Sequence, residues 1–239
     1  QDLATLGVQP AEKYPLASEH VDDMVALSER LVKKGYAYEK LRSLYFDISR
    51  FQEYGRLSGV DVDKIRLGAT VDLDEYEKDN PRDFTLLKRA KLAELKRCLY
   101  TKTEWGNVRP SWHIQCVAMS MRYLGDNYDI HTAGRELVFP HHENEIAQSE
   151  CAHGQTMANY WMHNGFLDMS GEKMSKSLGN VVLLSDLLAD WDGEVIKIAA
   201  SMWIAVRQIG ESSDDMRQRA AASHGKNDPP HADGRPIQA

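Results

Sequence analysis

The sequence predicts an α/β fold, and three features of its apolar pattern support that prediction. Apolar residues recur close to every 3.6 positions over residues 19–34, which predicts an amphipathic helix that Gly35 ends. Short aromatic-rich runs at 36–38 and 43–48 predict two strands, compatible with a hairpin. A further apolar run at 128–131 predicts a strand that leads into a glycine-containing turn at 132–134. Helices and strands therefore alternate along the chain.

The stretch after the predicted hairpin is expected to be irregular at first and helical later. Residues 53–82 alternate charged residues with Gly and Pro and predict an irregular insertion. Residues 86–99 predict a helix rich in basic side chains. The basic residues of this region are Lys88, Arg89, Lys91, Lys96, Arg97 and Lys102. A solvated helix face is the favoured interpretation of this cluster, and local contact with nucleic acid is the alternative.

Four more helices are predicted in the second half of the chain, and one of them has signals at both ends. Pro140 suits the opening of a helix that runs from about His141 to Ala152, with Gly154 just beyond its end. The other three helices are predicted over residues 111–123, 183–188 and 195–206.

Composition limits the class of protein. The net charge of −7 does not indicate a general nucleic-acid binder, and no apolar run approaches the length of a membrane span. The three cysteines include no close pair, which argues against a disulfide framework and favours the cytoplasm. Residues 211–239 contain no aromatic side chain and end in a polar run, so they are predicted to be disordered.

Three residues offer ligands of the kind that zinc prefers. His141 and Glu145 are four positions apart, so one helix face would carry both side chains. Cys116 would add a thiolate, and the three side chains together suit zinc. His142 and Glu143 compete with His141 and Glu145 for this assignment. On spacing alone, a helix start stabilised by its acidic residues is the favoured interpretation, and a metal site is the alternative.

A polar loop at residues 171–180 carries two lysines three positions apart between flanking glycines. Glycine permits a mobile loop, and the ammonium groups of Lys173 and Lys176 could follow the charge of a polyphosphate. Composition alone would favour a solvated turn.

The particular strings change this balance, because they resemble a known family. Lys173-Met174-Ser175-Lys176-Ser177 is similar to a signature of class I aminoacyl-tRNA synthetases. The segments 160–166 and 139–150 resemble the cysteine-specific member, cysteine–tRNA ligase. Shorter matches at 54–59, 80–84 and 109–114 occur in the same order, and the resemblance runs from residue 2 to about residue 200.

The resemblance implies specific roles for individual residues. Cys116, His141 and Glu145 match ligands of a zinc ion that binds the sulfur of the cysteine substrate. Trp112 and His131 match residues near the bound cysteine. Gly134, Met174 and Lys176 are assigned to ATP, and Lys173 and Lys176 to catalysis. The implied substrates and partners are cysteine, ATP with magnesium, and the tRNA for cysteine, with no membrane and no DNA.

This sequence departs from the family pattern in three places. The family's His-Gly-Gly-Gly-x-Asp turn is replaced by residues 131–136, which lose two glycines where the backbone approaches the nucleotide. The family's His-Ile-Gly-His motif and its first zinc-ligand cysteine lie upstream of this sequence. The match also ends near Ser201, before the anticodon-binding domain. Little adenylation activity is therefore expected from this chain alone.

The implied fold is part of a Rossmann-like catalytic domain with an inserted connective region. The expected divisions are residues 1–35 for the end of the first catalytic half, 36–104 for the insertion, 105–182 for the second half, 183–206 for a helical region that contacts the tRNA stem, and 207–239 for the tail. Two alternatives remain open at this point. One is a related ligase that joins cysteine to an amino sugar, and the other is a fragment that binds zinc or nucleotide without turnover.

Overall fold

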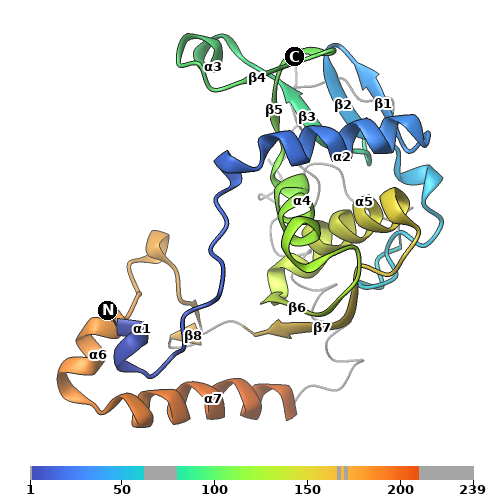
Figure 1. Cartoon of the computed structure of the whole chain (residues 1–239). Coiled ribbons are helices and arrows are strands. Elements are labelled where there is room, and N and C mark those ends of the chain that lie inside the picture. Colours follow the sequence, from blue (N-terminus) through green and yellow to red (C-terminus); the bar gives the residue numbers. More distant parts are fainter. Residues whose placement is uncertain (1, 62–79, 166–167, 170–171, 210–239) are drawn as a thin grey trace, which may run out of the picture. The chain divides into compact units, whose positions relative to one another are not determined.

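The computed structural model describes residues 2–61, 80–165, 168–169 and 172–209, which belong to two compact units (Figure 1). The larger unit spans residues 9–166. The smaller unit combines residues 1–8 with the chain from residue 167 onward. The predicted α/β composition is confirmed, because helices and strands alternate through the larger unit.

An antiparallel sheet of five strands forms one layer of the larger unit. Its strands are β1 Ala37–Lys40, β2 Ser43–Phe46, β3 Phe84–Arg89, β4 Thr101–Thr103 and β5 Gly106–Pro110, in the spatial order β1-β2-β3-β5-β4. The predicted hairpin is confirmed, because Tyr38 pairs with Tyr45 in the ladder between β1 and β2. Leu41 and Arg42 make its tight turn with φ values of 51° and 64°.

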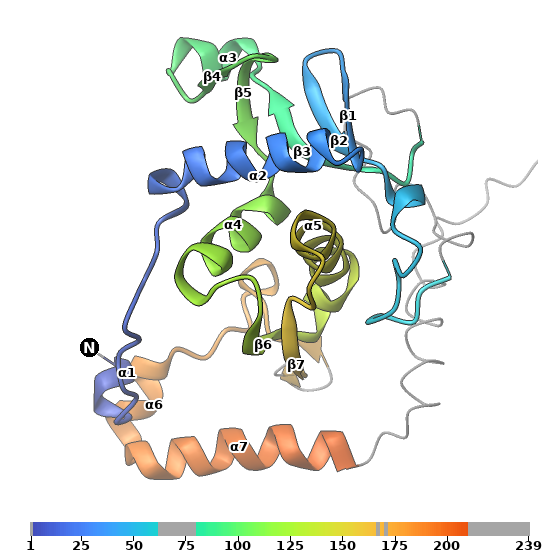
Figure 2. The same cartoon turned by 45° about the vertical axis from the view of Figure 1, so that its right-hand side comes forward.

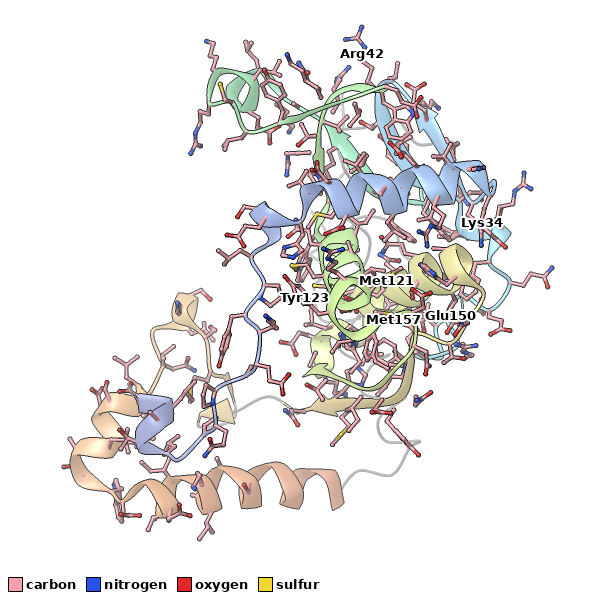
Figure 3. All side chains as sticks on the ribbon, viewed as in Figure 1. Lys34, Arg42, Met121, Tyr123, Glu150 and Met157 are labelled. Carbon is pink, nitrogen blue, oxygen red and sulfur yellow. The ribbon has the colours of Figure 1, made fainter. Side chains whose placement is uncertain are left out.

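Helix α2 (Val21–Lys33) lies between this sheet and two further helices, α4 (Trp112–Leu124) and α5 (Glu143–His153), as Figures 1 and 2 both show. Met24, Leu27 and Leu31 recur along the buried face of α2, and each is at most 4% exposed. Burying each of these side chains contributes about 2 kcal/mol. Beyond the end of α2, Lys34 donates to the carbonyl oxygen of Ala152 over 2.8 Å and joins α2 to α5 (Figure 3).

The prediction of a helix over residues 86–99 is wrong. Residues 84–89 form strand β3, and only Leu92–Lys96 form a helix, α3. The first four residues of β3 are all buried, since the strand lies inside the sheet with both faces covered. A continuous apolar run of this kind has no period that separates a strand from a helix. The six basic residues named above therefore belong to β3, α3, β4 and the connecting turns rather than to one helix face.

Strands β6 (Tyr128–Gly134) and β7 (Ala158–Asn164) form a parallel pair, and α5 makes the crossover between them. A parallel pair joined through a helix is the repeating unit of α/β folds. The turn predicted at 132–134 is wrong, because these residues continue β6 and pair with β7 as far as Gly134 and Asn164.

The chain between β6 and α5 winds differently from a regular helix. A 3-10 turn over Arg135–Leu137 is followed by a π-helical turn over Val138–His142 that is kinked at Phe139, whose backbone angles are not helical (φ −134°, ψ 134°), and α5 begins at Glu143. The predicted helix is thus confirmed from Glu143 onward, and its predicted end is confirmed by Gly154, which adopts a φ of 78°.

The smaller unit contains α1 (Asp2–Thr5), the hairpin of β8 (Asp168–Met169) and β9 (Glu172–Lys173), α6 (Leu184–Asp190) and α7 (Gly193–Ile209). The last two confirm the predicted helices at 183–188 and 195–206. The predictions for residues 211–239 and for most of 53–82 lie outside the described residues. No helix among the described residues is long and apolar enough to cross a membrane.

Candidate metal centre

The three ligands predicted from the sequence come together in the larger unit. Cys116 belongs to α4, His141 to the π-helical turn and Glu145 to the first turn of α5. Their sulfur, nitrogen and oxygen atoms lie within 4.8 Å of one another. His141 Nε2 is 3.3 Å from Glu145 Oε1.

Glu145 is the most unusual residue of this centre. Its side chain is fully buried, and neither carboxylate oxygen has a hydrogen-bond partner among the described residues. Burial raises the pKa of this carboxyl to about 8. An ionised carboxylate is unfavourable in such a place unless a cation or a donor compensates it. The site is therefore suited to a positive charge near Glu145.

The donor set also suits the zinc that the resemblance implies. Burial lowers the pKa of His141 to about 4, so its imidazole is neutral at pH 7 and its lone pair is available. Burial and the charge of Glu145 raise the pKa of the Cys116 thiol to about 12. A bound dication would reverse both acid shifts, because coordination stabilises the thiolate and the carboxylate.

Glu143, which competed with Glu145 in the sequence, is excluded from the centre by its contacts. Its carboxylate accepts hydrogen bonds from the backbone N–H of Gly55, over 3.0 Å, and of Ser58, over 2.5 Å. It therefore fixes the segment 54–58 against α5. Arg56 of the same segment reaches Glu150 of α5 over 2.9 Å and adds a second attachment.

Further histidines surround the centre, and the sequence analysis assigned no role to two of them, His113 and His163. His113 Nδ1 shares a hydrogen bond of 2.8 Å with His141 Nδ1, and His142 Nδ1 shares one of 2.7 Å with His163 Nε2. Six of the nine histidines lie between positions 113 and 163. This clustering of histidines in the sequence could have indicated a histidine-rich site, but it does not show which rings are in contact.

The two residues assigned to cysteine binding flank the same centre on different sides. Trp112 stacks on the ring of His141 with centroids 4.5 Å apart and planes 16° apart, and it remains 57% exposed. His131 Nε2 lies 3.3 Å from Glu145 Oε2. An exposed indole face beside the ligand set is available to a bound molecule.

Gly134 ends β6 beside Asn164 of β7. A methyl group added at Gly134 would meet the carboxylate of Glu136, a contact that the side chain of Glu136 could relieve by moving. In open α/β sheets, ligands bind beyond the carboxyl ends of parallel strands, and both residues lie at such ends.

The lysine loop belongs to the smaller unit. Lys173 ends β9, Met174 follows it half-buried, and Lys176 is exposed at the start of a 3-10 turn, Lys176–Leu178. The backbone N–H of Ser175 donates to Asn180 Oδ1 over 2.8 Å, and Ser175 Oγ accepts from the N–H of Leu178. These bonds give the loop a defined shape while leaving Lys176 in solvent.

Comparison with known proteins agrees with the fold. Residues 1–218 match the family model of the tRNA synthetases class I (C) catalytic domain, and the chain belongs to this family. Its curated relatives include cysteine–tRNA ligases. That of Methanosarcina mazei is 50% identical over 195 residues, which are 82% of this chain and 41% of the relative.

Two further cysteine–tRNA ligases match over nearly the same length. The relative from Pyrococcus horikoshii is 49% identical over 197 residues, and that from Carboxydothermus hydrogenoformans is 48% identical over 197 residues. In each case the match covers 82% of this chain and 40% or 41% of the relative. The chain therefore spans about two fifths of the length of the curated relatives it matches.

Proposed function

We propose that this chain supplies part of the catalytic domain of a cysteine–tRNA ligase. Such an enzyme activates cysteine with ATP and transfers the cysteinyl group to its tRNA. The observation that supports this proposal best is the meeting of Cys116, His141 and Glu145 within 4.8 Å in a chain whose matched relatives bear that name. One sulfur, one nitrogen and one oxygen ligand suit zinc, and three ligands leave room for a substrate atom.

Cysteine would be selected at this centre. Zinc bound by Cys116, His141 and Glu145 would hold the substrate as a thiolate, a form that serine's hydroxyl does not reach near neutral pH. Trp112 would cover the substrate with its exposed face, and His131 would approach it from the other side of Glu145. A pocket that used size alone would separate cysteine from serine far less well.

The nucleotide would be bound by the residues that the family resemblance assigns to ATP. Gly134, at the carboxyl end of β6, and Met174 are proposed to contact ATP. Lys176 and Lys173 would stabilise the negative charge that grows on pyrophosphate as the carboxylate of cysteine attacks the α-phosphate. Fixed positive charge at a developing anion is worth about 10²–10³ in rate for a single group.

A chimaera tests this proposal. The matched segment of the Methanosarcina mazei cysteine–tRNA ligase would be replaced by the corresponding 195 residues of this chain. We expect cysteine-dependent ATP–pyrophosphate exchange and charging of tRNA with cysteine. Lys176→Ala should lower the exchange rate by about 10²-fold or more and leave the zinc content unchanged. Cys116→Ser should lower the zinc content and the preference for cysteine over serine.

Two results would contradict the proposal. The first is a folded, zinc-containing chimaera that uses serine as well as cysteine. The second is transfer of cysteine to an amino sugar in place of tRNA, which would favour the related ligase. The matched relatives are cysteine–tRNA ligases, which favours tRNA as the acceptor.

A further inference from the structure

Glu145 faces a second set of possible ligands through its other oxygen. Its Oε1 lies 3.3 Å from His141 Nε2, which belongs to the first set. Its Oε2 lies 3.3 Å from His131 Nε2 and 3.7 Å from His142 Nε2. The ligand atoms of His131, His142 and Glu145 lie within 4.8 Å of one another, as those of the first set do. One buried carboxylate thus stands between two groups of ligands.

Both imidazoles of the second set form a hydrogen bond through Nδ1, the ring nitrogen that does not face Glu145. His131 Nδ1 shares a hydrogen bond of 2.6 Å with the hydroxyl of Tyr128, and His142 Nδ1 shares one of 2.7 Å with His163 Nε2. With Nδ1 engaged, Nε2 is the nitrogen left to face Glu145. Metal-bound histidines almost always have this arrangement, in which the outer hydrogen bond fixes the tautomer and the orientation of the ring.

The surroundings also match what a cation needs. His142 and Glu145 are buried, with side-chain exposures of 1% and 0%, and the His131 side chain is 14% exposed. Neither oxygen of Glu145 has a hydrogen bond within the part of the chain that the structure describes. Both carboxylate oxygens are therefore available to bind a cation, and His131 is the most exposed of the three side chains.

The spacing suits one dication after a small closure of the side chains. Bonds of about 2.1 Å to nitrogen and oxygen place tetrahedral ligand atoms roughly 3.4 Å apart. The distances of 3.3 and 3.7 Å from Oε2 to the two rings are close to this spacing. Two imidazoles and a carboxylate favour zinc, cobalt or nickel over magnesium or calcium.

We propose that His131, His142 and Glu145 form a second site for a divalent transition metal, joined to the site of Cys116 and His141 by the carboxylate of Glu145. Pairs of ions that share such ligands lie about 3.5–4 Å apart. Repulsion between the two dications makes the second ion bind more weakly than the first, by about tenfold or more. This inference does not depend on the proposed function, because it concerns the metal alone. If His131 also contacts cysteine, the second ion and the substrate compete for that ring.

Cobalt(II) is the probe, because its spectrum separates the two sites. The whole 239-residue chain is freed of metal with a chelator and titrated with cobalt(II). The first equivalent should produce a thiolate-to-cobalt charge-transfer band from Cys116. The second should add weak visible bands of a nitrogen and oxygen site without increasing the charge-transfer band. The paramagnetic resonance of the first ion should weaken as the second ion couples to it through Glu145.

Two variants show which site binds each equivalent of cobalt(II). His131→Gln with His142→Gln should lose the second equivalent and keep the charge-transfer band. Cys116→Ser should lose that band and still bind cobalt at the histidine site. If the double variant fails to fold, as judged by circular dichroism, His131→Gln alone should weaken the second equivalent by about tenfold or more.

The matched control changes two histidines that lie outside the described residues. His224→Gln with His231→Gln should retain both equivalents. The proposal is overturned if the unaltered chain binds one cobalt only. It is also overturned if the second equivalent survives the loss of His131 and His142, or disappears with His224 and His231.

Discussion

Glu143 and Glu145 are both fully buried on α5, two residues apart, and face different partners. Positions two apart on a helix project about 200° from each other, so the two carboxylates cannot serve one site. Glu143 accepts from the backbone of Gly55 and Ser58, whereas Glu145 faces the ring of His141. One attaches the connecting segment, and the other stands in the candidate metal centre.

Glutamine substitutions at these two positions should affect different properties: zinc affinity at Glu145 and folding stability at Glu143. Glu145→Gln removes a ligand, so we expect zinc affinity to fall by at least about 100-fold, measured by competition with a chromophoric chelator. The metal-free stability should not fall, because the variant removes an unpartnered buried carboxyl. Glu143→Gln should lower the free energy of unfolding by about 1–3 kcal/mol in urea, because its hydrogen bonds involve a charged acceptor.

The control is built into this pair. Glu143→Gln should change zinc affinity by only a few-fold, because it alters no ligand atom. An equal loss of zinc affinity in both variants would show that Glu145 acts by shaping α5 and does not bind the ion.

Metal binding should release protons in a pH-dependent number. The pKa of Glu145 is raised to about 8 and that of Cys116 to about 12, so both groups hold protons at pH 7 without metal. His141 holds none, because its pKa is lowered to about 4. We expect about two protons released per zinc at pH 7 and about one at pH 10, measured calorimetrically in buffers of different ionisation enthalpy. Cys116→Ser should release one fewer at pH 7, and an unchanged count would contradict the assignment.

The elements that the sequence predicted correctly are those whose signal is local. The apolar period of α2 lies within its own residues, and Gly154 ends α5 through its own φ angle. The chemistry of its thiol made Cys116 a candidate ligand, but only the family resemblance favoured it, because its distance along the chain from His141 does not indicate a contact.

The histidine cluster could not be predicted for a physical reason. His131 belongs to β6, His163 to β7 and His142 to the crossover between these strands. They meet only because β6 and β7 pair in parallel, with His131 opposite Trp161. Such pairing depends on the whole fold, and no short pattern in the sequence encodes it.

The stability of the metal-free chain should have a maximum near pH 6.5. The pKa values of His131 and His141 are lowered to about 4 and that of His142 to about 3. The folded state then binds fewer protons than the unfolded state between about pH 4 and 6.5, so stability rises with pH there. Glu145 acts in the opposite sense between about pH 4.5 and 8, because its pKa is raised to about 8. The three histidines outweigh it below about pH 6.5, and above that pH stability falls.

Urea midpoints measured with a chelator across this range would check the maximum. Glu145→Gln should remove the decline above pH 6.5 and make the rise below it steeper. A stability that climbs steadily to pH 8 in the unaltered chain would be inconsistent with a protonated Glu145.

Leu86 and Leu87 provide a direct test of why the helix predicted over 86–99 was wrong. Both side chains have an exposure of 0%, although they are neighbours in the sequence and point to opposite faces of β3. A strand covered on both faces buries all of its side chains, whereas a surface helix exposes those that lie opposite its apolar stripe. We expect Leu86→Ala and Leu87→Ala each to lower the free energy of unfolding by about 2–5 kcal/mol in urea denaturation. Leu92→Ala in α3 is the matched control, since Leu92 is 68% exposed and its loss should change stability by about 0.5 kcal/mol or less. A small effect at either Leu86 or Leu87 would place that residue on an exposed face and contradict the two-sided burial of β3.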